Sequence, residues 1–169
     1  MNREQAYKLA KSKFKNKNLF KHVLAVEAVM RELAAYLNED QEKWGLAGLL
    51  HDLDYEVTVD DPDRFPLVTE QILQEYDIDE EIITAIKCHN EKAPRDTNFG
   101  RAIYAADPVT GLIVAAALMH PDKKLKSIDV PFIMRRFKEK RFAAGANREQ
   151  IKSCGEFGLE LETFLEISL

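Results

Sequence analysis

Three of the four histidines in the chain fall on apolar stripes of expected helices, or at the ends of such stripes. They are His22, His51 and His89, and two acids in similar surroundings, Asp52 and Asp107, accompany them. A buried imidazole or carboxylate needs a polar partner, because burying it without one is costly. One divalent ion would satisfy these side chains together, and imidazole nitrogens and carboxylate oxygens suit Mn, Fe, Co, Ni, Zn or Mg. The residue types therefore indicate a metal centre.

The adjacent pair His51 and Asp52 lies in the stretch AGLLHDLDYE, at the end of an apolar run. Neighbouring residues of a helix point about 100° apart, so both reach one ion only if the ion lies between their directions. A helix that ends inside a bundle allows this, with His22 and Asp107 approaching from neighbouring helices. The alternative is that Asp52 is an ordinary helix C-terminal residue bonded to backbone donors. The periodicity alone does not separate these two interpretations.

Apolar residues recur with helical spacing along the chain, and no convincing strand alternation is present. The pattern predicts an all-α fold of six to eight helices. Asn38 and Gln41 fit a capping pair for the second of these helices, and Asp79 and Asn147 fit later caps. A polar, turn-rich stretch is expected at 58–66. The expected helices are 19–37, 40–53, about 66–76, one after Asp79, 98–119, one from Pro131, about 147–153, and one within 159–168.

Length and composition are those of one soluble domain with a sizeable core. The chain has 169 residues, of which 46% are hydrophobic and 31% charged, and its formal net charge is -5. This charge argues against wholesale or stable nucleic-acid binding. Two basic stretches, 8–21 and 135–142, are either solvated helix faces or surfaces that attract a small anion. We expect residues 1–169 to form a single domain, of unknown oligomeric state.

Two features favour a cytoplasmic location. Cys88 and Cys154 form no metal-binding or CxxC spacing, so we expect free, partly buried thiols in a reducing compartment. The first residues lack an apolar signal region, and the apolar run at 111–119 is too short to span a bilayer. The sequence therefore predicts no membrane partner.

The order His22, His51-Asp52, Asp107 resembles the H…HD…D signature of the HD-domain metal-dependent phosphohydrolases. The stretches KHVLAVEAVMRELA, WGLAGLLHDLDYE, EIITAIKCHNE and YAADPVTGLIVAAALMHPDKKL are similar to a bacterial and archaeal branch of HD hydrolases without settled substrates. The resemblance covers about residues 2–167. Four ligand types in this order, each on an expected helix, make it specific.

The resemblance implies a helical bundle with a metal in its core. Residues of about 15–120 would form the metal-site core, with C-terminal helices of about 121–169 packed on it. The four matching residues would hold one divalent ion, with water and a substrate oxygen in the remaining positions. The implied function is a phosphohydrolase that attacks a small phosphate ester, such as a nucleotide, with metal-activated water. The ligands would be His22, His51, Asp52 and Asp107.

Several positions depart from the patterns of related chains. Phe65 and Asn90 stand where dinuclear HD proteins carry further histidines, which favours one metal over two. No GYP motif follows, which disfavours that subclass of cyclic-dinucleotide phosphodiesterases. Tyr55 stands where some HD nucleotidases have a catalytic Glu. We therefore expect Asp54 to handle a proton or orient the water beside Asp52, the alternative being a solvated helix-end carboxylate.

The expected phosphate partners are His89, Lys21, Arg136 and Lys140. Arg136 and Lys140 are four residues apart and would share a helix face. For Lys21, Arg136 and Lys140 the alternative is an ordinary solvated side chain. For His89 the alternative is a position behind the metal ligands, where it would contact the ligands and not the substrate. Two other functions stay open at this point: a module that binds metal and nucleotide without hydrolysis, for sensing or scaffolding, and a phosphodiesterase.

Overall fold

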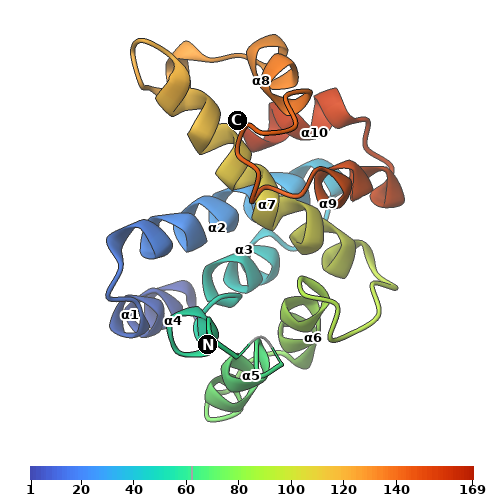
Figure 1. Ribbon diagram of the computed structural model, residues 1–169. Coiled ribbons are helices and arrows are strands. Elements are labelled where there is room, and N and C mark those ends of the chain that lie inside the picture. The colour runs from blue at the N-terminus through green and yellow to red at the C-terminus, as the bar shows by residue number, and fades with distance from the viewer. Residues whose placement is uncertain (62) are drawn as a thin grey trace.

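The protein is described here by a computed structural model covering residues 1–61 and 63–169 (Figure 1). These residues form helices and loops, and no strand is found among them, so the all-α prediction is confirmed. The expected turn-rich stretch at 58–66 includes residue 62, which lies outside the described residues. The helices are α1 Arg3–Lys13, α2 Lys17–Leu37, α3 Gln41–Leu50, α4 Tyr55–Thr58, α5 Leu67–Leu73, α6 Glu80–Cys88, α7 Asn98–Met119, η1 Leu125–Ser127, α8 Val130–Phe137, α9 Arg148–Lys152, η2 Ser153–Phe157 and α10 Leu161–Ser168.

The helices in this part of the chain outnumber the six to eight that the sequence predicts, for two reasons. Helix α1 occupies a stretch that reads only as a run of basic residues. Helix α4 and the 3-10 helices η1 and η2 contain four, three and five residues, too few for a periodic pattern to show. The longer helices agree well with the prediction, and α7 has the predicted bounds, 98–119.

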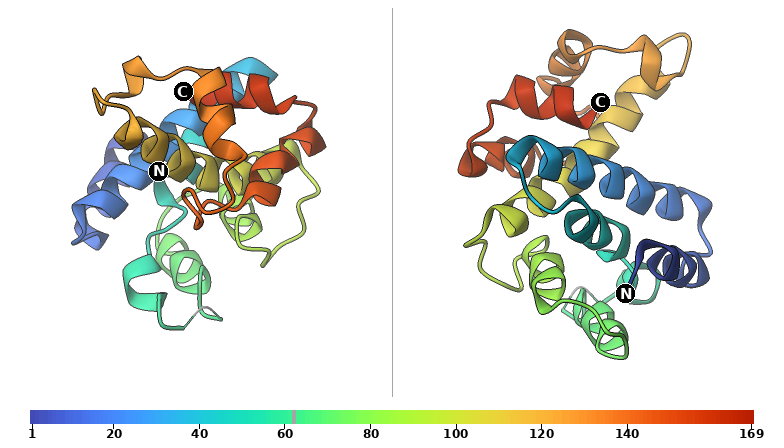
Figure 2. Two further views of the ribbon diagram at one scale, coloured as in Figure 1. Left: turned by 45° about the horizontal axis from the view of Figure 1, so that its top comes forward. Right: turned by 180° about the vertical axis from the view of Figure 1, so that it is seen from behind.

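Helix α3 lies at the centre, enclosed by α1, α2 and α6 as Figure 2 shows from behind. Every residue from Trp44 to Leu50 is buried. A Cβ at Gly48 would lie 2.8 Å from the backbone nitrogen of Glu27 and from the carbonyl oxygen of Val26. Gly48 therefore lets the backbones of α2 and α3 approach closely. Because α3 ends at Leu50, the residues that follow it sit in the interior of the molecule.

Helix α7 crosses the molecule beside α2, and α8, α9 and α10 pack against it at the upper end of Figure 1. Thr97 caps it by accepting a hydrogen bond from the Gly100 nitrogen, and the helix continues through Pro108. By length and composition alone α7 could cross a membrane, but most of its apolar stretch is buried inside the molecule. It has the properties of a core helix.

The predicted cap of α3 is wrong in detail. Asn38 terminates α2 instead, in the left-handed conformation at φ 59°, which Asn tolerates better than most residues. Asp40 is the N-cap of α3 and accepts a hydrogen bond from the Lys43 nitrogen at 3.0 Å. The predicted caps of α6 and α9 are confirmed, since Asp79 and Asn147 both accept backbone hydrogen bonds there.

A buried ionic network joins the first three helices. Glu27 of α2 is only 3% exposed and accepts hydrogen bonds from the guanidinium groups of Arg3 and Arg31. Arg31 also donates to Glu42 of α3, at 2.6 and 3.1 Å. Glu27 and Glu42 are thus paired with the guanidinium groups of Arg3 and Arg31.

Candidate metal centre

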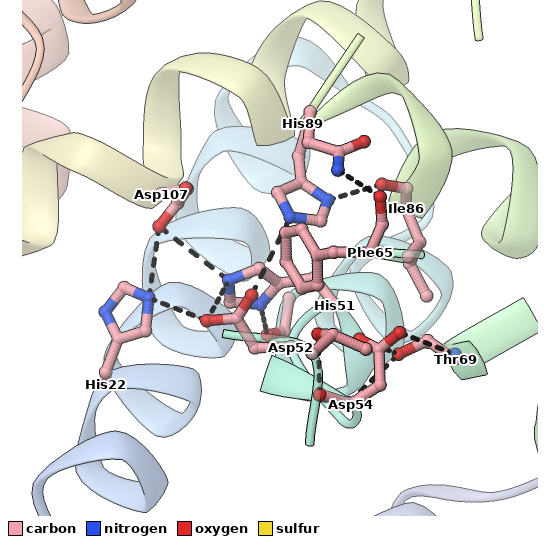
Figure 3. Close-up of polar contacts among 12 residues, drawn as sticks. His22, His51, Asp52, Asp54, Phe65, Thr69, Ile86, His89 and Asp107 are labelled. Carbon is pink, nitrogen blue, oxygen red and sulfur yellow. Dashed lines mark hydrogen bonds and ion pairs between the residues drawn. The ribbon is translucent and has the colours of Figure 1, made fainter. Parts of the chain in front are cut away.

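Five side chains from four parts of the fold converge on one point (Figure 3). His22 comes from α2, the pair His51 and Asp52 follows α3, His89 follows α6, and Asp107 lies in α7. The His22 Nε2 atom is 3.1 Å from Asp107 Oδ1 and 3.6 Å from Asp52 Oδ2. His51 Nε2 lies 3.4 Å from Asp52 Oδ2 and 3.7 Å from Asp107 Oδ1, and His89 Nε2 lies 3.7 Å from Asp52 Oδ1. The side chains expected to be ligands are thus brought together.

Two of the imidazoles are oriented by the helices that precede them. His51 and His89 are the C-cap residues of α3 and α6. The last carbonyls of a helix lack backbone partners. His51 Nδ1 donates to the Gly48 carbonyl oxygen at 2.8 Å, and His89 Nδ1 donates to the Ile86 carbonyl oxygen. A carbonyl oxygen can only accept, so each neutral ring carries its hydrogen on Nδ1 and a lone pair on Nε2.

Thr110 gives His22 the same tautomer. The Thr110 hydroxyl donates to the Asp107 carbonyl oxygen at 2.9 Å, so its lone pairs remain to accept from His22 Nδ1 at 3.1 Å. His22 Nε2 therefore also presents a lone pair to the carboxylates. The sequence analysis missed Thr110, although its place three residues after Asp107 puts it on the same face of α7. Three imidazole lone pairs thus meet two carboxylates.

The electrostatics of the cluster require a positive charge. Burial lowers the pKa of His51, but the charges of Asp52 and Asp107 outweigh burial and raise it to about 9. The pKa of Asp107 lies well below its usual range because the neighbouring imidazoles of His22 and His51 favour its charged form and outweigh its burial. Burial and the nearby His51 lower the pKa of His89. Without a metal, the site therefore retains a proton on His51.

The donor set fits a divalent ion. The Nε2 atoms of His51 and His89 are buried and have no hydrogen-bond partner among the described residues. Lone pairs of this kind, with their Nδ1 hydrogens fixed by outer partners, are the arrangement of imidazole ligands in metal sites. Two overlapping groups could hold an ion: His22, His51 and Asp107, and His51, Asp52 and His89.

This geometry changes the interpretation of His89 and Asp52. A neutral His89 with its hydrogen on Nδ1 turns a lone pair toward the site, which suits a cation and would repel a phosphate oxygen. Its position therefore favours a metal ligand over the phosphate-binding role expected from the sequence. The Asp52 carboxylate is 8% exposed and faces the three imidazoles. The alternative of a helix-end residue bonded to backbone donors finds no support in the described contacts.

Asp54 lies next to the cluster but is bonded elsewhere (Figure 3). Its side chain is fully buried, and its two oxygens accept hydrogen bonds from the Thr69 hydroxyl at 2.7 Å and the Thr69 nitrogen at 3.1 Å. Burial raises the pKa of Asp54 in spite of these bonds. The alternative of a solvated helix-end carboxylate is therefore wrong. Asp54 ties α5 to the segment beneath the metal site, and its part in proton transfer stays a prediction.

The expected phosphate-binding cations do not gather at the cluster. Lys21 is exposed on α2, directly before His22. Arg136 donates to Glu139 at 2.8 Å. Helix α8 ends at Phe137, so Lys140 lies beyond it, and the prediction that it shares a helix face with Arg136 is wrong. A substrate role for these three cations stays a prediction.

One side of the cluster is open and the other is closed. The side chains of His22 and Asp107 are 24% and 31% exposed, whereas those of His51 and His89 are buried. Phe65 covers the closed side, with its ring centroid 5.1 Å from that of His89. Among the described residues, the site is therefore accessible on the side of His22 and Asp107.

Comparison with known protein families identifies the family to which this fold belongs. The HD domain family matches residues 19–112, more than half of the chain and the part that contains all five clustered residues. The chain therefore belongs to the HD domain family. The matched segment lies inside the 15–120 region expected to form the metal-site core.

Among curated proteins the chain is similar to Ribonuclease Y. The proteins of that name from two strains of Nitratidesulfovibrio vulgaris are 33% identical over 96 residues, and the one from Oleidesulfovibrio alaskensis is 28% identical over 96 residues. Each match covers 57% of this chain and 18% of the relative, so the chain spans only about a fifth of the length of these relatives. No solved structure matches the chain.

Proposed function

We propose that the protein is a divalent-metal-dependent phosphohydrolase that acts on a small phosphate ester, such as a nucleotide. One observation carries the proposal: three imidazole lone pairs and two carboxylates point at a single site. The two carboxylates leave the site with two negative charges, which a divalent ion balances. The HD family match places this cluster in a family whose members are generally hydrolases.

In this proposal one ion is held by His22, His51, Asp52 and Asp107, with His89 as an additional donor. When bound, such an ion supplies Lewis-acid activation of water and neutralises charge on phosphoryl oxygens. The protein contributes the orientation of the ligands. The Gly48 and Ile86 carbonyls and the Thr110 hydroxyl hold the imidazoles at their Nδ1 atoms. Residues on the closed side exclude bulk water, which strengthens electrostatic interactions inside the site.

Substrate would enter along the open side, past His22 and Asp107. Lys21 precedes His22 on α2 and is exposed, so we propose that it attracts the phosphate on approach. Arg136 and Lys140 remain weaker proposals for the same role. We propose Asp54 for proton handling only through Asp52 or a water, because Thr69 occupies both of its oxygens. Buried, unpaired Cys88 and Cys154 support a reducing, cytoplasmic setting.

Phosphodiester cleavage is the second candidate, and the similarity to Ribonuclease Y favours it. Lys13, Lys15, Lys17 and Lys21 cluster near the junction of α1 and α2 and form no ion pair among the described residues. A short single strand could lie along such a surface. The net charge of -5 counts against stable binding of long nucleic acids. A module that binds metal and nucleotide without turnover is the third alternative.

Phosphate release from an aryl monoester, an aryl diester and a panel of nucleotides tests these functions together. The assay uses the full chain with Mn, Co, Ni or Mg. We expect metal-dependent release from a monoester, abolished in His51→Ala and in Asp107→Ala. His120→Ala is the matched control, because His120 lies outside the cluster and bonds to the segment at Asp122. Retained activity in the first two variants would refute the proposal, and preference for the diester would favour the second candidate.

A further inference from the structure

A cavity of about 410 Å³ adjoins the open side of the metal centre. His22 and Asp107 form its floor at one end, so it is continuous with the cluster. Its volume is in the range of small-molecule sites, about 300–1,000 Å³. Apart from these two ligands, no lining residue carries a charged side chain. The rest of the lining consists of Pro108, Gly111, Ala115, Ala143, Gly145 and Ala146.

No close contact with a neighbouring element explains why residue 111 is a glycine. Gly111 lies inside the 22-residue helix α7, one turn after Asp107. A glycine inside a helix costs about 0.5–1 kcal/mol relative to alanine. Gly48 is explained by the close approach of α2, but a Cβ at Gly111 would meet nothing within 4 Å. Gly111 is exposed, and the space beside it is open toward the cavity that it lines.

The opposite wall shows the same feature. Gly145 also has open space where a Cβ would lie, and its φ is not in the left-handed region, so its backbone does not require glycine. The segment after α8 passes across α7 here, as the left view of Figure 2 shows. Two glycines with vacant Cβ positions thus border one cavity from different elements.

Arg148 holds this second wall in place. Its guanidinium donates to the carbonyl oxygens of Ala143 at 2.9 Å and Ala146 at 2.6 Å, and also to those of Phe137 and Phe142. Ala143 has φ 45°, a left-handed conformation that is costly for a residue with a Cβ. Strained residues persist only where their surroundings hold them, and they cluster at ligand sites. The loop is therefore fixed in a shape that keeps the cavity open.

The floor of the cavity borders the interior of the cluster. His51 Nε2 is fully buried, has no hydrogen-bond partner among the described residues, and faces Asp107 Oδ1 on the cavity floor at 3.7 Å. The floor is thus polar and borders the unpaired Nε2 atom of His51, while the walls are small and carbon-rich. This division matches a molecule with an anionic head and an uncharged body.

We propose that this cavity binds a flat, aromatic organic group of a phosphate ester whose phosphate lies at the metal centre. The proposal rests on the proposed function for the position of the phosphate. Gly111 and Gly145 set the size of the group that fits, and Arg148 positions the wall that carries Gly145. Small walls on both sides suit a planar ring system of the aryl or nucleobase kind, which gains affinity by burying its faces.

Binding of two phosphonates tests the proposal without relying on turnover. Phenylphosphonate and methylphosphonate share one head group and differ only in the aromatic body, and their C–P bonds resist hydrolysis. Titration calorimetry with the Mn-loaded full chain should show phenylphosphonate binding about tenfold more tightly, because its ring is buried. In Gly111→Leu and in Gly145→Leu this preference should disappear, while methylphosphonate affinity stays within about twofold.

Two variants serve as controls. Gly111→Ala adds only the Cβ for which space exists and should keep the preference. Gly155→Leu is the matched control, because Gly155 also has a vacant Cβ position but does not line the cavity. Thermal unfolding and Mn content show that each variant is folded and loaded. Because Gly111 and Gly145 lie on different elements, failure of one leucine variant to fold leaves the other to decide.

Equal affinities in the wild-type protein, no binding of either phosphonate, or a preference that survives in a folded leucine variant would overturn the proposal. These outcomes differ from failure of the proposed function. Phenyl preference without hydrolysis of phenyl phosphate would refute the hydrolase and keep the aromatic site. Hydrolysis of phenyl phosphate without a preference for phenylphosphonate would refute the aromatic site and keep the hydrolase.

Discussion

Two buried acidic clusters in this molecule differ in the groups that surround their carboxylates. Glu27 is closed by Arg3 and Arg31, and with the neighbouring Glu42 the network contains two negative and two positive side chains. Asp52 and Asp107 are surrounded by imidazoles whose hydrogens point outward to Gly48, Ile86 and Thr110. A buried carboxylate is costly unless it is paired. The first cluster finds its cations within the chain, whereas the carboxylates of the second contact imidazoles and no arginine or lysine among the described residues.

The difference separates stability from function. The Glu27 network links α1, α2 and α3 and needs nothing further to be neutral. In the metal-free protein, the proton on His51 balances only part of the negative charge of Asp52 and Asp107. Substitutions in the first cluster should therefore change the free energy of unfolding, and substitutions in the second should change metal binding and catalysis.

The largest effect is expected for Asp107→Asn. This change keeps the shape of the side chain but removes one of the two charges that require a cation. With Mn, phosphate release should fall by roughly 1,000-fold or more, since the ion supplies both water activation and charge neutralisation. Metal content measured on the same samples should fall as well. A loss of less than about tenfold would contradict the assignment of Asp107 as a ligand.

Glu27→Gln should have the converse effect. The variant leaves Arg3 and Arg31 without their shared carboxylate, and Arg31 is largely buried. The free energy of unfolding should fall by about 2–4 kcal/mol, below the usual cost of breaking a buried pair because Arg3 is half exposed. Urea denaturation measures it.

The matched control for this change is Glu4→Gln. Its exposed pair with Lys8 should contribute less than about 1 kcal/mol. Metal content and activity per folded molecule should stay at the wild-type level in both variants. A marked loss of metal in Glu27→Gln would show that the two clusters are not independent.

The metal-free protein should lose stability as pH rises. The pKa of His51 is about 9 in the folded chain and about 6.5 in an unfolded one, so folding favours its protonated form. This contribution is fully present below about pH 6.5 and is lost as pH rises through about 9. Metal competes with the same proton, so Mn should raise the Tm little at pH 6.5 and strongly at pH 9.

Thermal unfolding with and without Mn measures both the fall of the metal-free Tm with rising pH and the pH dependence of the Tm increase by Mn. His51→Ala is the control in which both pH dependences should be weaker. A metal-free Tm that is independent of pH across this range would show that His51 carries no stabilising proton.

The smallest effect is expected for Thr110→Val, which removes the acceptor for His22 Nδ1 but leaves all the ligands. Loss of such outer partners lowers metal affinity about 10–100-fold in other metal sites, and we expect the lower end because His22 is partly exposed. Competition with a fluorescent chelator measures the affinity. Thr58→Val, which removes another buried hydroxyl that bonds to the Asp54 carbonyl and to none of the proposed ligands, should leave metal affinity unchanged.

The sequence predicted well what depends on periodicity and residue type. Helix α7 has its predicted bounds because a long apolar stretch with a Thr cap leaves little choice. The ligands His22, His51 and Asp107 come together because each falls on an inward-facing position of a helix or at its end. The start of the short helix α3 was harder to predict, because it depends on which polar residue is the N-cap. Asp40 is the N-cap of α3, whereas Asn38 is the C-cap of α2.

The sequence could not predict contacts made by distant segments. The sequence left Asp54 either as a proton-handling residue or as a solvated carboxylate, and only the return of α5 shows that Thr69 contacts it and that it is buried. Arg148 falls at the start of the helix expected at 147–153, and only the path of the chain shows that it donates to four carbonyl oxygens of the preceding segment beside the cavity. The tautomers of the histidines likewise depend on acceptors that no spacing rule identifies.

Elemental analysis of the full-length chain, purified without chelator and dialysed against Mn, tests the central claim most directly. The wild-type protein should retain about one divalent ion per chain, and Asp107→Asn and His51→Ala should retain almost none while Glu27→Gln retains the wild-type amount. A folded wild-type protein that takes up no divalent ion, or one whose ion survives both of the first two substitutions, would contradict the account.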